Sequence, residues 1–197
     1  FNVCVSDVDP KVDDMVVFNI LQRGRLSGWI ARSRKSKEWH HENLKRHKEL
    51  GEPLVLRYRN SNNDFSKMLG GLDEITDRTH TLILVEGLMD KANIDRLMDL
   101  DNIDEIKCCF TFGSNLSEDQ IKLIPNSVEE IILMYDLGTF NIMQDVGSRL
   151  LTMFDVKVAI LKDDDIDPGN MDKKYLFNIL ENLKEFLYFY NQLKSYN

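Results

Sequence analysis

The sequence predicts an α/β fold: a mostly parallel sheet flanked by helices, preceded by a smaller mixed α+β subdomain. After His80, short apolar runs alternate with helical patterns, as they do in parallel sheets with right-handed crossovers. Before that point the pattern is less regular and favours strands joined by a short turn. We expect a basic N-terminal subdomain over residues 1–78, the α/β domain over 79–170 and a C-terminal helix over 171–197.

The length of 197 residues suffices for one or two domains with a substantial core. No apolar run approaches the ~20 residues that span a bilayer, so no membrane association is expected. Cys4, Cys108 and Cys109 lack the C-x-x-C spacing of zinc sites, and the adjacent pair is expected to be buried. This cysteine usage favours a cytoplasmic location. Because the chain begins at Phe1, we interpret it as part of a longer protein.

In the first subdomain we expect a helix over residues 38–50 and strands at 3–5, 15–21, 26–31 and 54–58. The second and third strands flank a turn at residues 22–25 and predict a hairpin. The helix ends before Gly51, a common helix stop. A metal site would need acidic or Cys partners besides the histidines of this helix, so we expect those to be solvated: His40, His41 and His47.

The α/β domain has four predicted strands and three predicted helices, and the C-terminal helix follows as a fourth. The strands are expected at residues 82–85, 106–112, 130–135 and 156–161. The helices are expected at residues 88–100, from 117 onward, at 140–154 and at 171–194. Ser117 and Gln120 have the spacing of a capping box, which marks the start of the second helix.

Acidic residues follow three of these strands. Glu86 ends the first strand, with Asp90 one helical turn later; Asp136 follows the third strand, and an acidic run at residues 163–167 follows the fourth. Since parallel strands place their carboxyl ends at one edge, we expect these groups to converge and to bind a divalent cation such as Mg²⁺. The alternatives are that Glu86 caps a helix, that the acids are solvated, or that another fold with acids at its strand edge is present.

Charge is distributed unevenly along the chain. Residues 22–48 contain nine Lys and Arg against two Glu, a net charge of 9 − 2 = +7, so the remainder carries −8 − 7 = −15. This polarity suggests a basic face for phosphates beside an acidic face for metal. The alternative is a solvated basic helix and loop.

Several motifs, in order, resemble those of one protein family. Val85-Glu86-Gly87 followed by Met89-Asp90 is similar to V-E-G-x-M-D in the TOPRIM domain of bacterial-type (DnaG-like) DNA primases. Further similar segments are residues 24–32 (GRLSGWIAR), 57–61 (RYRNS), 65–72, 111–120 (TFGSNLSEDQ), 131–141 (IILMYDLGTFN) and Asp167-Pro168. The resemblance spans residues 24–171 and implies a TOPRIM-like sheet in an RNA-polymerase core that makes short primers.

The resemblance also implies roles for individual residues. Glu86 matches the catalytic Glu of the family, and its metal-binding acids match Asp90, Asp136 and Asp167. The candidates for binding nucleic acid or nucleotide are Arg25, Arg32, Arg57, Arg59 and Lys67. The implied cofactor is Mg²⁺ or Mn²⁺, and the implied partners are a single-stranded DNA template, ribonucleoside triphosphates and a replicative helicase. The zinc-binding and helicase-contacting domains of such primases are not visible in this sequence.

The sequence departs from the family pattern at four positions. Gly138 stands where D-x-D has its second Asp, and Gly169 where D-P-D has its last. Phe140 and Asn141 replace a small Ala-Gly pair. These departures keep open a divergent phage enzyme, a catalytically silent TOPRIM-like nucleic-acid-binding or replisome scaffold, and a TOPRIM nuclease or topoisomerase-like enzyme. A topoisomerase would also need a nucleophilic Tyr, and neither Tyr135 nor Tyr188 has the context for it.

Overall fold

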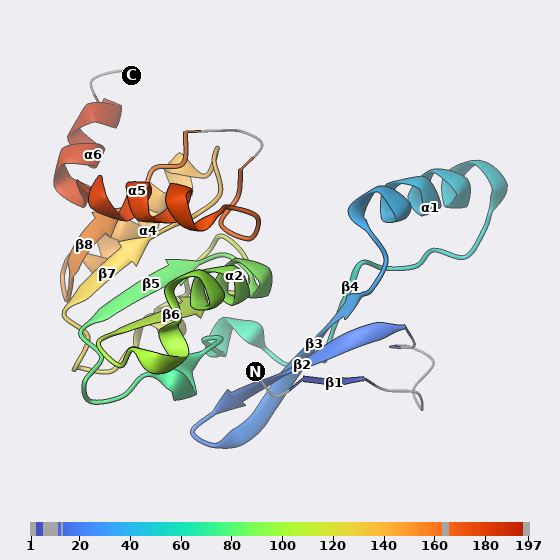
Figure 1. Ribbon diagram of the computed structural model, residues 1–197, viewed down its shortest axis with the longest axis horizontal. Helices are drawn as coiled ribbons and strands as arrows, with labels where there is room; N and C mark the ends of the chain where they lie inside the picture. The colour runs from blue at the N-terminus through green and yellow to red at the C-terminus, as the bar shows by residue number, and fades with distance from the viewer. Residues whose placement is uncertain (1–2, 6–11, 13, 163–165, 195–197) are drawn as a thin grey trace. The chain divides into compact units, whose positions relative to one another are not determined.

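The computed structural model describes residues 3–5, 12, 14–162 and 166–194 of the chain (Figure 1). Contacts divide the chain into two compact units, Phe1–Asp64 and Phe65–Asn197. None of the helices in the described ranges combines the length and apolar character that a bilayer crossing requires.

The first unit contains a four-stranded antiparallel sheet in the order β1-β2-β3-β4. Its strands are β1 (Val3–Val5), β2 (Met15–Gln22), β3 (Arg25–Ser33) and β4 (Tyr58–Asn60). The predicted hairpin is confirmed, because β2 and β3 pair around Arg23 and Gly24, which both have positive φ (54° and 71°). Two successive residues of this kind match the twist of a tight hairpin. A small core of Val12, Met15 and Ala31 packs with this sheet.

Helix α1 (Lys37–Leu50) lies between β3 and β4 in the chain, and Figure 1 shows it beyond the ends of these strands. The Ser36 side chain accepts a hydrogen bond from the Trp39 N–H, and Gly51 ends the helix in the left-handed conformation. The predicted strand at 54–58 is wrong, since β4 begins only at Tyr58. The backbone of residues 52–55 bonds to side chains of α1 instead of to a neighbouring strand.

The prediction that all three histidines are solvated is also wrong. The Nδ1 atom of His40 lies 3.1 Å from the Val55 carbonyl oxygen, and the His40 side chain is buried. Asn43 is buried as well: its amide donates to the Pro53 carbonyl and accepts from the Val55 N–H. His41 and His47 are exposed, as predicted.

The second unit contains the predicted α/β fold, a five-stranded sheet in the order β6-β5-β7-β8-β9. Its strands are β5 (Thr81–Val85), β6 (Ile106–Phe110), β7 (Glu130–Leu133), β8 (Asp155–Val158) and β9 (Lys184–Glu185). Strands β5 to β8 are parallel, and β9 pairs antiparallel with β8. Strands β6, β7 and β8 end two or three residues before the predicted ends at 112, 135 and 161.

Helices cover both faces of this sheet. They are α2 (Leu88–Met98), α3 (Glu118–Ile121), α4 (Phe140–Leu150), α5 (Lys173–Glu181) and α6 (Phe186–Lys194). Three short 3-10 helices accompany them: η1 (Phe65–Lys67), η2 (Leu72–Glu74) and η3 (Leu100–Asn102). Figure 1 shows α2 and α5 side by side on one face of the sheet. The main core on the other face includes residues of α3, α4 and α6, and Cys108 and Cys109 are buried as predicted.

The prediction of a single helix over 171–194 is wrong, because this range contains two helices, α5 and α6, separated by β9. Helix α5 ends at Asn182, whose side chain donates back to the Asn178 carbonyl. The next residues form β9, which pairs with the open edge of β8 and satisfies backbone groups that a continuous helix would leave bare. Helix α6 then places Phe186 and Phe189 in the core.

Substituting Gly147 tests the packing of α4 against α6. A Cβ at this position would lie 2.1 Å from the Phe186 Cε2 atom, and the Phe186 ring is 1% exposed and cannot swing away. We expect Gly147→Ala to lower the free energy of unfolding by about 1–3 kcal/mol through overpacking, despite the better helix propensity of Ala. Urea unfolding measures this. Asn141→Ala, at an exposed position of the same helix, is the control and should change it by less than about 0.5 kcal/mol.

Candidate active site

Glu86 lies directly after β5, the strand between β6 and β7. Gly87 follows in an extended conformation, and its N–H donates to the Asp90 Oδ2 atom at 2.8 Å. This bond satisfies a backbone donor at the start of α2 and tilts the Asp90 carboxylate back toward the end of β5. Glu86 and Asp90 therefore lie at the same end of the strand.

Asp136 comes three residues after β7, the neighbour of β5. Its N–H donates to the Glu86 Oε1 atom at 3.2 Å, which ties the two strand ends together. The Thr139 hydroxyl donates to the Asp136 carbonyl at 2.7 Å and closes a turn through Gly138. Gly138 has a φ of +91°, so any other residue there would be strained. The departure from D-x-D is thus matched to the shape of this turn.

Asp167 lies in the loop after β8, and its N–H donates to the Asn170 side chain at 2.9 Å. Helix α2 holds this loop through Asn93, whose amide donates to the Pro168 and Met171 carbonyls, both at 2.9 Å. Sequence reasoning missed Asn93. Its signal is a polar residue three positions after Asp90, on the same side of the helix. Residues 163–165, the remaining acids of the run, lie outside the described residues.

Gly169 has its backbone against two of the acids. A Cβ at this position would lie 2.8 Å from the Asp90 Oδ1 atom and 3.2 Å from the Asp167 Oδ1 atom. The absence of a side chain at Gly169, where the family pattern has an Asp, therefore allows the loop to lie close to α2. The Oδ1 atoms of Asp90 and Asp167 both face this point.

The four carboxylates influence one another's protonation. Burial, followed by the negative charge of Asp136, raises the pKa of Asp90 to about 7. Burial and Asp136 likewise raise the pKa of Glu86, and burial with Asp167 raises the pKa of Asp136. Glu86, Asp90 and Asp136 are thus penalised for carrying charge beside like charges, a setting that favours a bound cation.

The donor set fits a hard divalent cation. Only carboxylate oxygens are involved, and the Asp136 Oδ1 atom is buried with no hydrogen-bond partner among the described residues. Glu86 and Asp90 each use one oxygen in a backbone bond. In the described part of the chain, no group of three or more His, Cys, Asp and Glu side chains has the geometry of a metal site. The argument for a cation therefore depends on the type of ligand atoms and on the repulsion among the carboxylates, and not on a complete coordination geometry.

The segment after β6 contacts the acidic edge through its backbone. The Gly113 N–H donates to the Glu86 carbonyl at 2.9 Å, and the Thr111 N–H donates to the Val85 carbonyl at 3.1 Å. Between them Phe112 has a φ of +63°, a conformation that non-glycine residues seldom adopt. Buried Gln120 donates to the Met68 and Thr111 carbonyls, at 2.8 and 3.0 Å. Gln120 therefore fixes both this segment and the one that carries Lys67.

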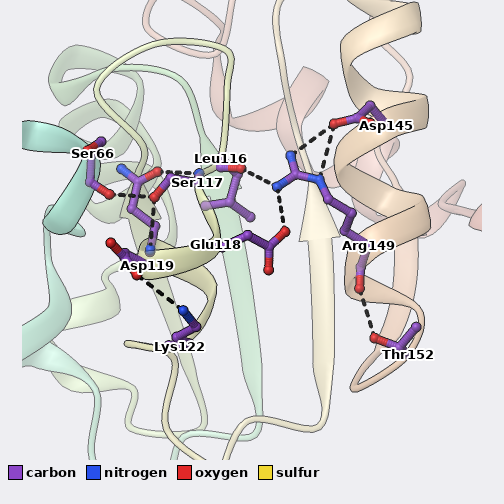
Figure 2. Close-up of polar contacts among 10 residues, drawn as sticks. Ser66, Leu116, Ser117, Glu118, Asp119, Lys122, Asp145, Arg149 and Thr152 are labelled. Atoms are coloured by element: carbon purple, nitrogen blue, oxygen red, sulfur yellow. Dashed lines mark hydrogen bonds and ion pairs between the residues drawn. The ribbon is translucent and has the colours of Figure 1, made fainter.

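Arg149 of α4 connects this helix to the segment that follows β6 (Figure 2). Its guanidinium donates to the Leu116 carbonyl at 2.6 Å and forms ion pairs with Glu118 and Asp145 at 3.3 and 3.0 Å. Figure 2 shows Ser117, beside Leu116, bonded to Ser66. This network supports the segment that contacts Glu86 and was not anticipated from the sequence.

The arginines predicted to bind nucleic acid lie in the first unit. Arg32 donates to the Tyr58 hydroxyl at 2.5 Å, and the guanidinium carbons of Arg32 and Arg57 lie 5.3 and 5.6 Å from the Tyr58 ring centroid. Arg59 pairs with Ala31, next to the Arg32–Tyr58 pair, so it lies on the other face of the sheet. Arg25 is exposed at the start of β3.

Lys67 belongs to η1 in the second unit, where it is exposed. The structure therefore groups Arg32 and Arg57 around one ring, but it does not group all five predicted basic residues. Their roles in binding stay predictions.

Comparisons of the sequence with protein-family models and with curated proteins find no match. Solved structures do match. The zinc-binding and RNA polymerase domains of Aquifex aeolicus primase have a TM-score of 0.63 at 20% identity, over 93% of this chain and 44% of that chain. The DnaG primase catalytic domain bound to single-stranded DNA has a TM-score of 0.64 at 17% identity, over 93% and 58%. The fold is that of a DnaG-type primase catalytic domain.

The primase fragment of the bacteriophage T7 primase-helicase also matches, with a TM-score of 0.54 at 15% identity. The match covers 86% of this chain and 64% of that one. The chain thus spans less than two thirds of each of these three primase chains. At such identities the likeness concerns the DnaG-type fold, which confirms the predicted fold class.

Within this primase fold, α2 carries a buried positive charge next to Asp90. The Lys91 side chain is 0% exposed, and its Nζ atom lies 2.6 Å from the Glu74 Oε2 atom and 2.7 Å from the Asp95 Oδ2 atom. Burial opposes the charge, but the nearby negative groups outweigh it and raise the pKa of Lys91. Sequence reasoning missed this cluster, because a single Lys in a helical pattern gives no sign of burial.

Removing the charge of Lys91 should unfold the protein more easily. We expect Lys91→Met to lower the free energy of unfolding by about 3–5 kcal/mol, since Glu74 and Asp95 would be left without their cation. Chemical denaturation measures this. The matched control is the neutral triple variant Glu74→Gln/Lys91→Met/Asp95→Asn, which should recover most of the loss. If Lys91→Met is as stable as the parent, the cluster does not stabilise α2.

Proposed function

We propose that this chain is the catalytic core of a DNA primase, which joins ribonucleotides into short primers on single-stranded DNA with the help of Mg²⁺ or Mn²⁺. The observation that carries the proposal is the set of carboxylates from β5, α2, β7 and the loop after β8 at one edge of a primase-type sheet. The resemblance of the motifs around Glu86, Asp136 and Asp167 supports it. So does the likeness in fold to primase catalytic domains from bacteria and a phage.

Glu86, Asp90, Asp136 and Asp167 would hold the metal. When bound, a divalent cation neutralises the triphosphate of the incoming nucleotide and the departing pyrophosphate. Glu86 is the proposed catalytic residue. Its Oε1 atom accepts a hydrogen bond from the Asp136 N–H, and its carboxylate would accept the proton of the attacking 3′-hydroxyl as pyrophosphate departs.

The first unit would hold the template. The proposed phosphate contacts come from Arg25, Arg32, Arg57 and Arg59, and the guanidinium groups of Arg32 and Arg57 both lie near the Tyr58 ring. Lys67, on the segment fixed by Gln120, would contact the incoming nucleotide. A replicative helicase is the proposed larger partner, on the analogy of the T7 primase-helicase.

A second candidate is a nucleic-acid-binding scaffold without catalysis. Gly138 and Gly169 favour it, because two carboxylates of the family pattern are missing and both positions are shaped for glycine. Tyr135 does not favour a topoisomerase: it is 1% exposed, and burial raises its pKa to about 12. Catalysis and metal binding separate the first two candidates.

Loss of the Glu86 carboxylate should abolish primer synthesis. We expect Glu86→Gln to reduce the incorporation of labelled ribonucleotides on a single-stranded template by about 100-fold or more, because proton transfer is lost. Glu129→Gln, at an exposed position of the same unit, is the control and should synthesise normally. Unfolding curves confirm that both variants fold. Synthesis by Glu86→Gln at the rate of the parent would remove Glu86 from the mechanism.

Calorimetry should detect a metal site at the acidic edge. Titration with Mn²⁺ is expected to give saturable binding, which Asp136→Asn weakens by about 10-fold or more because an oxygen ligand and a charge are removed. The control is Asp119→Asn, an exposed acid of α3. The absence of saturable binding in the parent protein would favour the scaffold over the enzyme.

A further inference from the structure

We infer that the outer face of α1 is a binding surface for the phosphate backbone of single-stranded nucleic acid. This surface consists of Lys37, His41, Lys45 and Lys48, which we call the α1 basic stripe. The inference deepens the proposed function, since it assigns α1 a part in holding the template. It concerns residues 33–56, which lie between the two motifs of the first unit that resemble primases.

The geometry of a helix places these four residues on one face. Their spacing of four, four and three residues keeps them within a narrow stripe, about 16 Å long for a rise of 1.5 Å per residue. All four side chains are exposed. Since phosphates of a stacked strand follow one another at about 3.4 Å, the stripe matches several nucleotides.

Within the described residues the lysines of the stripe form no ion pair, although Glu42 and Glu49 lie on the same helix. Nearby Arg34 and Lys35 form ion pairs with Asp14, at 3.4 and 3.0 Å, and Arg46 pairs with Glu52 at 3.3 Å. In the described residues, no such pair includes Lys37, Lys45 or Lys48.

Glu38, the acid closest in sequence to the start of the stripe, is engaged at the start of α1. Hydrogen bonds from its own backbone N–H and from Ser36 lower its pKa, ahead of the charges of His41 and Lys37. Glu38 thus lies in the first turn of α1, where a negative charge is favoured by the helix dipole.

The opposite face of α1 forms hydrogen bonds with the segment that follows the helix, so the stripe faces solvent. His40, Asn43 and His47 bond to the backbone of residues 52–55. Polar contacts thus fasten α1 to its own return segment, and Figure 1 shows the helix beyond the sheet of the first unit. Residues 33 and 57 connect this element to β3 and β4, beside Arg32 and Tyr58.

Single-stranded nucleic acid is the occupant that these charges favour. Ammonium groups on a straight, exposed helix offer point contacts to a repeating anion and no pocket for a defined acidic side chain. The second unit carries a net charge of −11, against +3 for the first, the −8 of the whole chain being −11 + 3. Attraction of a long polyanion is therefore expected mainly on the first unit.

Fluorescence anisotropy with a labelled oligo-dT tests the inference on the full chain. The variant Lys37→Gln/Lys45→Gln/Lys48→Gln should raise Kd by about 10-fold or more at moderate salt. Three lost phosphate contacts should also reduce the slope of log K against log salt by about 2. The matched control Lys122→Gln/Lys173→Gln/Lys174→Gln removes the same charge from exposed positions of the second unit and should change Kd less than 2-fold.

The result separates the stripe from the proposed enzyme. Unchanged affinity, or equal weakening in the control variant, overturns the inference, and so does a parent protein that does not bind the oligonucleotide. If the stripe variant loses affinity while neither parent nor variant makes primers, the inference stands and the primase proposal fails. If primers are made and the stripe variant binds normally, only the inference fails.

Discussion

Repulsion among carboxylates is the constraint on which the arrangement of the second unit depends. Glu86, Asp90 and Asp136 lie at one edge of the sheet, and burial together with a neighbouring carboxylate raises the pKa of each. Backbone N–H groups offset part of this cost, since Gly87 donates to Asp90 and Asp136 donates to Glu86. The strand ends are thus held in place by the same acids that destabilise them.

Around this edge, polar contacts of side chains with the backbone hold the loops in place. Gln120 and Arg149 fix the segment after β6, and Asn93 fixes the loop that carries Asp167. Buried Lys91 ties the first turns of α2 to Glu74 of η2 and pairs with Asp95 of the same helix. Such contacts are directional, so they set the positions of carboxylates more tightly than apolar packing would.

The sequence was informative where a pattern repeats or a motif has a fixed spacing. Alternating strands and helices predicted the parallel sheet, and the acids at strand ends predicted which residues share an edge. Features made by distant partners were not predictable: the burial of Lys91 depends on Glu74, and that of His40 on the backbone of Val55. The break between α5 and α6 was missed because β9 is defined by pairing with β8 and not by its own composition.

The two glycines that depart from the family pattern have a structural meaning that letters alone do not convey. Gly138 has a backbone conformation that suits glycine, and Gly169 lies too near the Asp90 carboxylate for a side chain. Restoring an Asp would therefore strain the backbone at position 138 and displace the Asp90 carboxylate or the loop at position 169. Both loops have adapted to the residues they now contain.

Strand β9 also limits how the molecule can meet copies of itself. A parallel sheet that ended at β8 would present a row of unpaired amide and carbonyl groups, along which a second chain could extend the sheet. Strand β9 occupies part of that row with only Lys184 and Glu185, which pair with Val158 and Lys157 and are both charged and exposed. The edge that remains is therefore short and charged, which disfavours sheet growth on this side.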